Sequence, residues 1–417
     1  MSNAHVLSLA QRLKAAQPQI ARASTAFKND LLLHIADCLE SSADEILEAN
    51  RTDLSHAEQN GIPTVMLDRL SLSVARIHAI AEGVRKVARL SDPVGQILTG
   101  RTLPNGLQIR SVRVPLGVVG MIYESRPNVT VDAAVLCLKA SNAVLLRGGK
   151  EAIATNTVLA RVMQRAIAEK GMNPDILLLV EDTSRDSANA MMRLTGYLDV
   201  LIPRGGAGLI RSVVENSTVP VIETGAGNCH VYIDRSADLE MGVNVVYNAK
   251  TSRPSVCNAC ESLLVHKDAA EAFLPMVKAK LDEKNVVIHG CEKTRAILGD
   301  TVIPAQESDY VTEYLGYEIS VKVVEDIDEA ITHINRNSTH HSEAIITNDL
   351  MSADRFTAQV DSAAVYVNAS TRFTDGDEFG FGAEIGISTQ KLHARGPMGL
   401  EALTSTKYIV QGNGQIR

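Results

Sequence analysis

The stretch Val118-Val119-Gly120-Met121-Ile122 decides the fold, because it is the first of a series of short apolar runs separated by helical segments. The runs with a strand pattern lie at residues 118–122, 143–146, 176–180, 199–202, 219–222 and 230–233. Helical patterns lie between them, for example in Ala152–Lys170 and Gly206–Asn216. Short apolar strands that alternate with helices predict a mostly parallel sheet covered on both faces. In such a sheet a nucleotide site is expected at the carboxyl ends of the strands.

The pattern continues on both sides of this series. Residues 1–90 are predicted to be helical, because apolar residues recur at helical spacing up to the break at Ser91-Asp92-Pro93. A second α/β run extends from Ser262–Val265 to about Tyr366–Asn368. The fold class is therefore predicted as α/β, with two α/β domains whose sheets are rich in parallel strands.

A β-ribbon is predicted between the helical region and the first α/β run. The Asn105-Gly106 pair is typical of a tight hairpin turn, and apolar residues alternate with polar ones after it, up to Val114. The C-terminal segment Lys407–Gln411 is also strand-like and is a candidate to pair with this ribbon. The isolated position of the ribbon indicates an arm that reaches away from the core.

Composition excludes several classes of protein. The 417 residues are 45% hydrophobic, which is enough for a large core, and the net charge is −8. Because 41 basic and 49 acidic residues are mixed along the chain, the sequence argues against a nucleic-acid partner. No apolar run approaches the roughly 20 residues that a membrane helix needs. The six scattered cysteines, and an N-terminus unlike a secretory signal, predict a reducing, cytoplasmic location.

Two glycine-containing turns are candidates for binding phosphate groups. Arg147-Gly148-Gly149-Lys150 follows the strand at 143–146, and its cations suit phosphates, including the 2′-phosphate of NADP. Gly205-Gly206-Ala207-Gly208 precedes a helix, where glycines let a pyrophosphate approach the backbone. Each turn has a plainer alternative, which is a solvated turn for the first and an ordinary tight strand-to-helix turn for the second.

The segment Thr251–Cys260 contains two cysteines in a C-x-x-C pattern, Cys257 and Cys260. A cysteine near a helix N-terminus and a cation is readily ionised, and the thiolate is the nucleophilic form. The alternatives are a redox disulfide, a zinc site and two packing cysteines, although a zinc site would need a second ligand pair at suitable spacing. We expect one cysteine to be nucleophilic and the other to pack. The local sequence alone leaves the packing alternative open for both.

Two polar segments nearer the C-terminus are candidates for a substrate site. His340-His341-Ser342-Glu343 follows a polar turn and offers groups that contact an anion or place a proton donor, with structural histidines as the alternative. Gly380–Leu400 is a glycine-rich polar run with few packing residues. Its density of hydrogen-bond donors favours a site.

Taken in order, these segments resemble the aldehyde dehydrogenase superfamily, and within it the branch that reduces γ-glutamyl phosphate. The resemblance covers essentially the whole chain. It rests on the segments Val114–Gly120, Tyr123–Thr130, Leu145–Glu151, Ser252–Asn258, Val324–Ile345 and Ser388–Leu400. It implies an aldehyde dehydrogenase-like α/β fold, in which a β-ribbon oligomerisation arm accompanies the two α/β domains.

The resemblance also assigns the parts of the chain. Residues 1–101 and 118–250, with part of 370–395, would form the nicotinamide cofactor-binding domain. Residues 251–369 would form the catalytic domain, and residues 102–117 and 396–417 the oligomerisation arm. The chain is therefore expected to form a homo-oligomer, and an association with glutamate 5-kinase is a further expectation.

Catalytic roles follow from the same resemblance. Cys257 falls at the position of the nucleophile, which selects it over Cys260. The Cys257 backbone N–H and Asn258 are expected to stabilise the oxyanion. Arg126 stands where hydrolytic members carry an asparagine, and a guanidinium offers a bidentate fork for a phosphate. Glu223 resembles the glutamate that activates water in hydrolytic members, and it is left without a role because a reductase must keep water from its thioester.

Binding roles complete the expected site. NADP(H) binding is assigned to Arg147, Gly148, Lys150, Gly205, Gly206 and Glu313, and the last of these resembles the glutamate that contacts the nicotinamide ribose. Substrate binding is assigned to Arg253, His340, His341 and Lys391. No metal site is expected.

The activity implied by the resemblance is the reduction of L-glutamyl 5-phosphate to L-glutamate 5-semialdehyde by NADPH in proline biosynthesis, with release of phosphate through a Cys257 thioester. The nearest alternative is a hydrolytic NAD(P)-dependent semialdehyde dehydrogenase, which would not need phosphate to oxidise the semialdehyde. A catalytically silent binding protein on the same fold is disfavoured by the presence of Cys257, Arg147 and Lys150. A cysteine hydrolase is disfavoured because no local histidine and carboxylate accompany Cys257.

Overall fold

The computed structural model describes residues 2–62, 64–124 and 126–417, so Ser125 of the Tyr123–Thr130 segment lies outside the described residues. The chain forms two compact units. The first unit contains the residues up to Thr224, together with Gly380–Gly386 and Met398–Arg417. The second unit contains Gly225–Phe379 and Ile387–Pro397.

The first unit contains a parallel four-stranded sheet with the order β5-β4-β3-β6. Its strands are β3 (Val118–Tyr123), β4 (Ala143–Arg147), β5 (Leu177–Leu179) and β6 (Val200–Arg204). The predicted parallel sheet is therefore confirmed for these strands. Residues 219–222 differ from the prediction, because they contribute only an isolated bridge between Val221 and Leu201.

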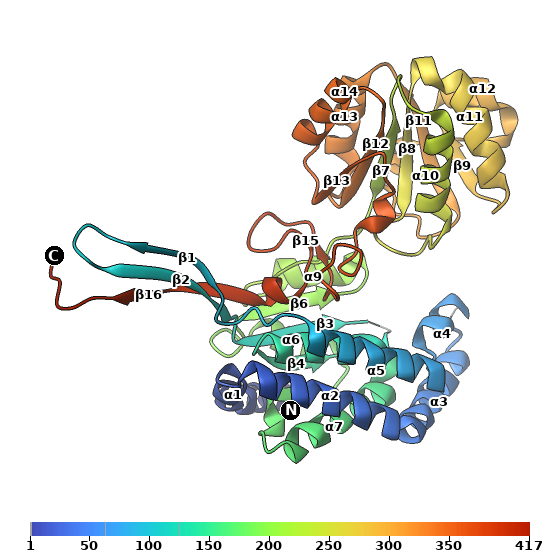
Figure 1. Ribbon diagram of the computed structural model, residues 1–417. Helices are drawn as coiled ribbons and strands as arrows, with labels where there is room; N and C mark the ends of the chain where they lie inside the picture. The colour runs from blue at the N-terminus through green and yellow to red at the C-terminus, as the bar shows by residue number, and fades with distance from the viewer. Residues whose placement is uncertain (1, 63, 125) are drawn as a thin grey trace. The chain divides into compact units, whose positions relative to one another are not determined.

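Helices surround this sheet, and the helical prediction for the N-terminal region is confirmed (Figure 1). They are α1 (Ser2–Ala21), α2 (Thr25–Ser41), α3 (Ala43–Gln59), α4 (Thr64–Leu70), α5 (Val74–Arg89), α6 (Pro127–Lys139), α7 (Ile153–Glu169), α8 (Arg185–Met192) and α9 (Ala207–Asn216). Short 3₁₀ helices η1 (Lys150–Ala152), η2 (Pro174–Ile176) and η6 (Leu400–Leu403) belong to the same unit. Helix α6 is apolar on nearly all sides and is buried against β3, β4, α5 and α7, as such a helix must be.

A three-stranded antiparallel ribbon with the order β1-β2-β16 also belongs to the first unit. Its strands are β1 (Ile97–Thr102), β2 (Gln108–Pro115) and β16 (Thr404–Gln411). The predicted pairing of the C-terminal strand with the ribbon is confirmed, because β16 runs beside the whole of β2. The ribbon begins at Ile97, before the predicted start, and its turn contains Gly106 with a φ of +87°. Figure 1 shows the ribbon projecting away from the helices of its unit.

The second unit contains a parallel seven-stranded sheet with the order β10-β9-β11-β8-β7-β12-β13. Its strands are β7 (Cys229–Ile233), β8 (Cys260–His266), β9 (Val287–Gly290), β10 (Ile303–Pro304), β11 (Glu318–Val324), β12 (Ser342–Ile346) and β13 (Ala364–Val367). A short antiparallel pair, β14 (Ile387–Ser388) and β15 (Gly396–Pro397), lies outside this sheet. The second predicted α/β run is therefore confirmed as a parallel sheet.

Both faces of the second sheet are covered by helices. They are α10 (Leu239–Thr251), α11 (Lys267–Asp282), α12 (Glu292–Leu298), α13 (Ile327–Asn337) and α14 (Leu350–Gln359), with the 3₁₀ helices η3 (Gly299–Thr301), η4 (Glu307–Val311) and η5 (Thr371–Phe373). Consecutive residues along a strand point their side chains to opposite faces of the sheet. Leu263 and Val265 accordingly join an apolar cluster with α10, α11 and α12, whereas Leu264 joins a cluster with α13 and α14.

The boundary between the two units differs from the expected one. The first unit ends at Thr224, whereas the cofactor-binding domain was expected to run to residue 250. Strand β7 pairs with β8 on one side and β12 on the other, which places it inside the second sheet together with α10. Of the expected addition from 370–395, the segment Gly380–Gly386 belongs to the first unit. No helix in the described part of the chain is long and apolar enough to cross a membrane.

Candidate active site

The first unit brings several of the expected site residues to one edge of its sheet. Arg126 follows β3, the Arg147–Lys150 turn follows β4, and Gly205 follows β6. These three strands are parallel neighbours, so their carboxyl ends lie at the same edge. That edge is where α/β sheets bind nucleotides.

The Arg147 side chain has a structural role in addition to its position at this edge. Its Nη2 donates to the Thr183 carbonyl at 2.7 Å and to the Ser184 carbonyl at 3.0 Å, which holds the loop after β5. Burial lowers the pKa of Arg147. Its buried Nε has no hydrogen-bond partner within the described residues, so one donor is left for a ligand. Lys150 is exposed and adds a second cation to the turn.

Gly148 lets the same turn approach its neighbours closely. A Cβ at this position would collide with the Asn156 amide, whose nitrogen is buried without a partner in the described chain. The combination of a backbone without a side chain, two cations and orphaned buried donors fits the phosphate groups of a nicotinamide dinucleotide.

The Gly205-Gly206 turn is occupied in part by a carboxylate of the protein. The Gly206 N–H donates to Glu124 Oε2 at 2.9 Å, and a Cβ at Gly205 would collide with the same carboxylate. Gly206 is the N-cap residue of α9 and provides no side-chain cap. The plainer alternative of a tight strand-to-helix turn therefore accounts for Gly205, since Glu124 requires its missing side chain.

Arg126 lines a cavity of about 60 Å³ at the same edge, and the other charged groups of this cavity are Asp132, Arg204 and Glu384. Burial raises the pKa of Asp132 to about 6, although Asn128 donates to its carboxylate at 3.0 Å. Arg126 thus faces a mixture of cations and carboxylates and not a purely positive pocket. Its role as a phosphate fork stays a prediction.

In the second unit, Cys257 lies in the loop between the end of α10 and the start of β8. It is half-buried, whereas Cys229 and Cys260 are fully buried. Burial raises the pKa of Cys260 to about 12 and that of Cys229 well above its usual range. Cys257 is therefore the accessible thiol of the three. The loop follows a helix C-terminus, so the expected helix N-terminus beside a reactive cysteine does not apply to Cys257.

The alternatives for the C-x-x-C pair find no support in the geometry. None of the six cysteines forms a disulfide within the described residues, and Cys260 lies in β8 with its thiol donating to the Ser262 carbonyl at 3.4 Å. Neither Cys257 nor Cys260 belongs to a group of potential metal ligands in the described chain. Cys260 packs in the core, as expected for the second cysteine.

The backbone of Cys257 is held by two neighbours. Cys229 Sγ donates to the Cys257 carbonyl oxygen at 3.2 Å. Gly227 packs so closely beneath this carbonyl that any Cβ there would overlap it, which explains the glycine. The Gly227 N–H donates to Glu313 Oε1 at 2.8 Å. Glu313 thus fixes the turn beneath Cys257, in addition to the expected cofactor contact.

The Asn258 side chain is committed to the protein. Its Nδ2 donates to the carbonyls of Arg372 at 3.2 Å and Thr374 at 2.9 Å, and its Oδ1 accepts a hydrogen bond from the Arg372 guanidinium. Both amide hydrogens are used, so the expectation that this side chain stabilises the oxyanion is not supported. Its role is to position the loop that carries Cys257.

Arg372 is a site residue that the sequence analysis missed. Its Nε donates to Ser252 Oγ at 3.1 Å, and its guanidinium is half-buried. Burial lowers the pKa of Arg372, the nearby charge of Arg253 lowers it further, and Cys257 raises it. The surroundings of Cys257 therefore contain two cations, Arg253 and Arg372. No pattern in the sequence pointed to Arg372, which lies 114 residues after its partner Asn258.

The His340–Glu343 cluster is largely structural. Glu343 is fully buried and accepts from the His230 N–H at 2.7 Å and from the Ser338 hydroxyl. His341 is also fully buried, with Nδ1 2.8 Å from Ser342 Oγ. The geometry therefore does not support the predicted substrate contact of His341, because its ring is not presented to a solute.

His340 and Lys391 meet at a common partner. His340 has a φ of +60° and places Nδ1 2.6 Å from the Asp361 carbonyl oxygen. Lys391 pairs with the Asp361 carboxylate at 2.6 Å, and Lys391 and Arg395 together lower the pKa of Asp361 to about 2. Lys391 is exposed, but its charge is already balanced by this carboxylate. Arg253 is exposed and remains the clearest substrate-binding candidate of the expected set.

Comparison with known proteins covers nearly the whole chain. The sequence profile of the aldehyde dehydrogenase family matches residues 1–315 and 301–409. A γ-glutamyl phosphate reductase of Carboxydothermus hydrogenoformans is 59% identical over 412 residues, which cover 99% of each chain. One from Clostridium novyi is 55% identical over 413 residues, again 99% of each chain. The crystal structure of a γ-glutamyl phosphate reductase from Thermotoga maritima matches with a TM-score of 0.97 at 48% identity, covering 99% of each chain.

Proposed function

Because the chain belongs to the aldehyde dehydrogenase family, and within it to the γ-glutamyl phosphate reductases, we propose that it reduces L-glutamyl 5-phosphate to L-glutamate 5-semialdehyde with NADPH and releases phosphate, as a step of proline biosynthesis. The observation that carries the chemistry is the partial exposure of Cys257 beside two fully buried cysteines. A nucleophile must be reachable, and Cys257 is the partly exposed cysteine of these three, whereas the other partly exposed cysteines, Cys38 and Cys291, lie outside this loop.

The proposed reaction begins at Cys257. Its thiolate attacks the carbonyl carbon of the acyl phosphate, a C–S bond forms, and the C–O bond to phosphate breaks with the electron pair leaving on the phosphate. NADPH, when bound, supplies the hydride that reduces the resulting thioester. The C–S bond then breaks, which releases the aldehyde and returns the thiolate. The covalent link keeps the substrate at Cys257 between the two halves of the reaction.

Arg253 and Arg372 support the first half of this reaction. Cations beside a cysteine favour its thiolate form. They also attract an anionic substrate, and a guanidinium offers two parallel N–H groups to a carboxylate or phosphate. Arg372 is held by Ser252 and Asn258, so its charge is fixed in place before the substrate arrives. The Cys257 backbone N–H remains the proposed oxyanion donor.

The first unit is proposed to hold the cofactor. The residues of this unit proposed for the role are Arg147, Gly148 and Lys150; Gly205 and Gly206 stay predictions, because Glu124 already occupies part of their turn. The cofactor contact of Glu313 is a separate prediction. The strongest support is the turn after β4, with its exposed Lys150 and the unpaired Nε of Arg147. The 2′-phosphate of NADP(H) needs such cations. Arg126 is proposed to bind the phosphate of the substrate.

The ribbon of β1, β2 and β16 is proposed as an oligomerisation arm. All residues of β1 are exposed, and apolar side chains remain open on the ribbon, among them Ile97 at 58% and Tyr408 at 72% exposure. Exposed apolar groups on paired strands are typical of surfaces that a partner covers. We therefore propose a homo-oligomer. A cytoplasmic location is also proposed, supported by six cysteines of which none forms a disulfide in the described chain.

A trapping experiment tests the proposed nucleophile. The enzyme is incubated with glutamate 5-semialdehyde and NADP⁺ without phosphate, and the acylated peptide is identified by mass spectrometry. We expect the adduct on Cys257. Cys257→Ser should abolish both adduct and turnover while NADPH still binds, and Cys260→Ser is the control that should keep turnover. Substantial turnover by Cys257→Ser would remove Cys257 as the nucleophile.

A further inference from the structure

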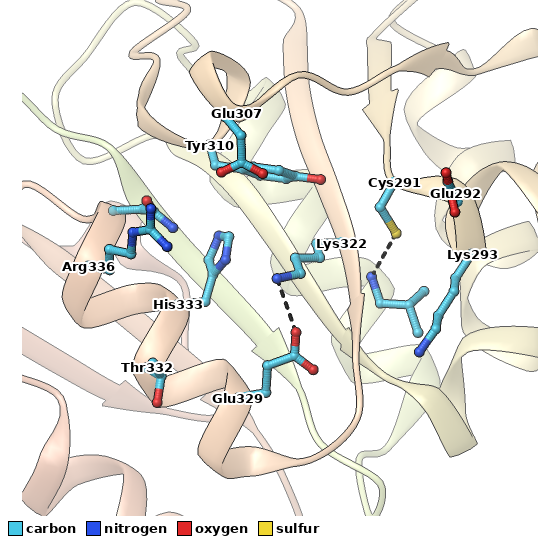
Figure 2. A pocket seen from close by; sticks show the side chains of 12 residues that line it. Cys291, Glu292, Lys293, Glu307, Tyr310, Lys322, Glu329, Thr332, His333 and Arg336 are labelled. Carbon is cyan, nitrogen blue, oxygen red and sulfur yellow. Dashed lines mark hydrogen bonds and ion pairs between the residues drawn. The ribbon is translucent and has the colours of Figure 1, made fainter.

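The second unit contains a cavity that the proposed reaction does not use. Its volume of about 470 Å³ lies in the range of small-molecule sites. It is bounded by the start of α12, by η4, by the end of β11 and by α13. Figure 2 shows the side chains of Glu307, Tyr310, Lys322, His333 and Arg336 around this space.

One wall of the cavity lies near the carboxyl ends of β9 and β11, where the chain leaves the two strands in opposite directions across the sheet. Cys291, which lines it, directly follows β9, and Val323 is the next-to-last residue of β11. From β9 the chain continues through α12 to the edge strand β10, whereas from β11 it continues through α13 to β12 on the other side of the sheet. Carboxyl ends of neighbouring strands whose connections diverge are where α/β proteins bind ligands.

One wall of the cavity is remote from the catalytic cysteine, whereas the wall at η4 and the end of α13 comes nearer to it, because Asn228, next to Gly227, donates to the carbonyls of Tyr310 and Asn337. Cys257 precedes Cys260, the first residue of β8, and so lies at the amino end of that strand. Val323 of β11 is paired with Val265 of β8. Val265 is five residues beyond Cys260, so the cavity wall at Val323 lies roughly 17 Å further along the sheet at about 3.3 Å per residue.

His333 points to a ligand in this cavity. It is 7% exposed, and its Nε2 has no hydrogen-bond partner within the described residues. Figure 2 shows the ring directed into the cavity, beside Lys322 and Arg336. Burial lowers the pKa of His333 to about 3, and His230, Lys322 and Arg336 contribute, so the ring is neutral near pH 7. A buried polar atom without a partner is costly unless a ligand or water completes it.

The charges of the cavity are balanced in sign. Its cations are Lys293, Lys322 and Arg336, and its carboxylates are Glu292, Glu307 and Glu329. Lys322 pairs with Glu329 at 3.0 Å, and Lys293 pairs with Glu325 outside the cavity. Among the ion pairs formed by described residues, none involves Arg336 or Glu307. Glu292 is likewise in none of these ion pairs, but Figure 2 shows it beside Cys291 and Lys293, on the far side of the cavity from Arg336 and Glu307. On the side of the His333 ring, one cation and one carboxylate therefore remain available together.

We propose that this cavity binds a small zwitterion of the α-amino acid class, with its carboxylate against Arg336 and the His333 ring and its ammonium group against Glu307. A phosphorylated ligand would need a surplus of cations, and a polyamine a surplus of carboxylates. The described chain contains two groups of potential metal ligands, and both lie outside this cavity. One group is His34, Cys38 and Glu169, and the other is Glu40, His78 and Glu82. The cavity is thus a second ligand site, and the inference does not depend on the proposed reaction.

Calorimetric titration of the full chain tests this proposal. All titrations use the Cys257→Ser background, so that no adduct forms at the catalytic thiol while Cys291 in the cavity wall stays unmodified. Each of the protein L-amino acids is titrated, with succinate and 1,4-diaminobutane as probes that carry only one sign of charge. We expect at least one amino acid to bind at one site per chain, and both single-sign probes to bind at least about tenfold more weakly.

Variants connect the binding to the cavity. Arg336→Ala and Glu307→Gln should each weaken the amino acid by about tenfold or more, because each removes a charged hydrogen-bond partner. Arg235→Ala is the matched control, since Arg235 is an exposed arginine of the same unit outside the cavity, and it should leave the affinity unchanged. Circular dichroism confirms that each variant is folded. Absence of binding by every amino acid, or equal affinity of both cavity variants and the parent, would overturn the proposal.

Discussion

Replacing Lys250 with methionine would leave a buried carboxylate without its cation. Lys250 on α10 and Glu261 on β8 form an ion pair in which neither side chain is exposed. Burial raises the pKa of Glu261 to about 7, and Lys250 opposes that rise. Removing one member of a buried pair costs about 3–5 kcal/mol of stability, whereas replacing both by apolar groups is often nearly neutral.

The loss of stability should depend on pH. The pKa of Glu261 is about 7 in the folded chain against an ordinary value of 4.5, so its contribution to stability is fully present below the ordinary value and is lost as the pH rises through the folded one. Without Lys250 the folded pKa rises further. We therefore expect Lys250→Met to cost about 3–5 kcal/mol near pH 8.5 and less near pH 6, where the carboxyl is protonated in both proteins.

Urea unfolding followed by circular dichroism measures this loss. The series consists of the parent chain, Lys250→Met, Glu261→Leu and the double variant, because a double-mutant cycle isolates the pair. The double variant should regain most of the stability lost by Lys250→Met. A loss below about 1 kcal/mol for Lys250→Met, or a double variant less stable than either single one, would refute the argument.

Three further predictions concern the site and the ribbon. Arg372→Ala should slow alkylation of Cys257 by iodoacetamide about tenfold, because the thiolate loses a neighbouring cation, with Arg235→Ala as the control; equal rates would contradict this role. Glu223→Gln should lower phosphate-dependent turnover less than about tenfold, whereas a general base of a hydrolytic enzyme would cost about a hundredfold or more. Tyr408→Glu on β16 should reduce the particle mass measured by light scattering, and an unchanged mass would argue against the oligomerisation arm.

The sheets could be predicted from sequence because each strand is a local apolar run. The boundary between the two units could not be predicted in this way. The strand at Cys229–Ile233 has the same apolar pattern as the earlier strands, and only its pairing with β8 and β12 assigns it to the second sheet. Pairing between distant segments leaves no periodic signal in the strand itself.

In the candidate site, too, the features that are local in the sequence could be predicted, and those that depend on distant segments could not. Cys257 was expected as the nucleophile, and its partly exposed position suits that role. Arg372 was missed because it reaches the Cys257 loop from 114 residues beyond Asn258. His341 and Glu343 were given a polar, loop-like interpretation, but both are fully buried at β12, which is flanked by strands on both sides. Burial of polar groups depends on long-range packing, which composition alone does not reveal.

The dependence of aldehyde oxidation on phosphate tests the central claim most directly. NADP⁺ reduction is followed with glutamate 5-semialdehyde as the substrate, with and without inorganic phosphate. If Cys257 carries a thioester that is resolved by phosphate, steady turnover requires phosphate and yields the acyl phosphate. Turnover at the same rate without phosphate, with free glutamate as the product, would contradict the account and identify a hydrolytic dehydrogenase.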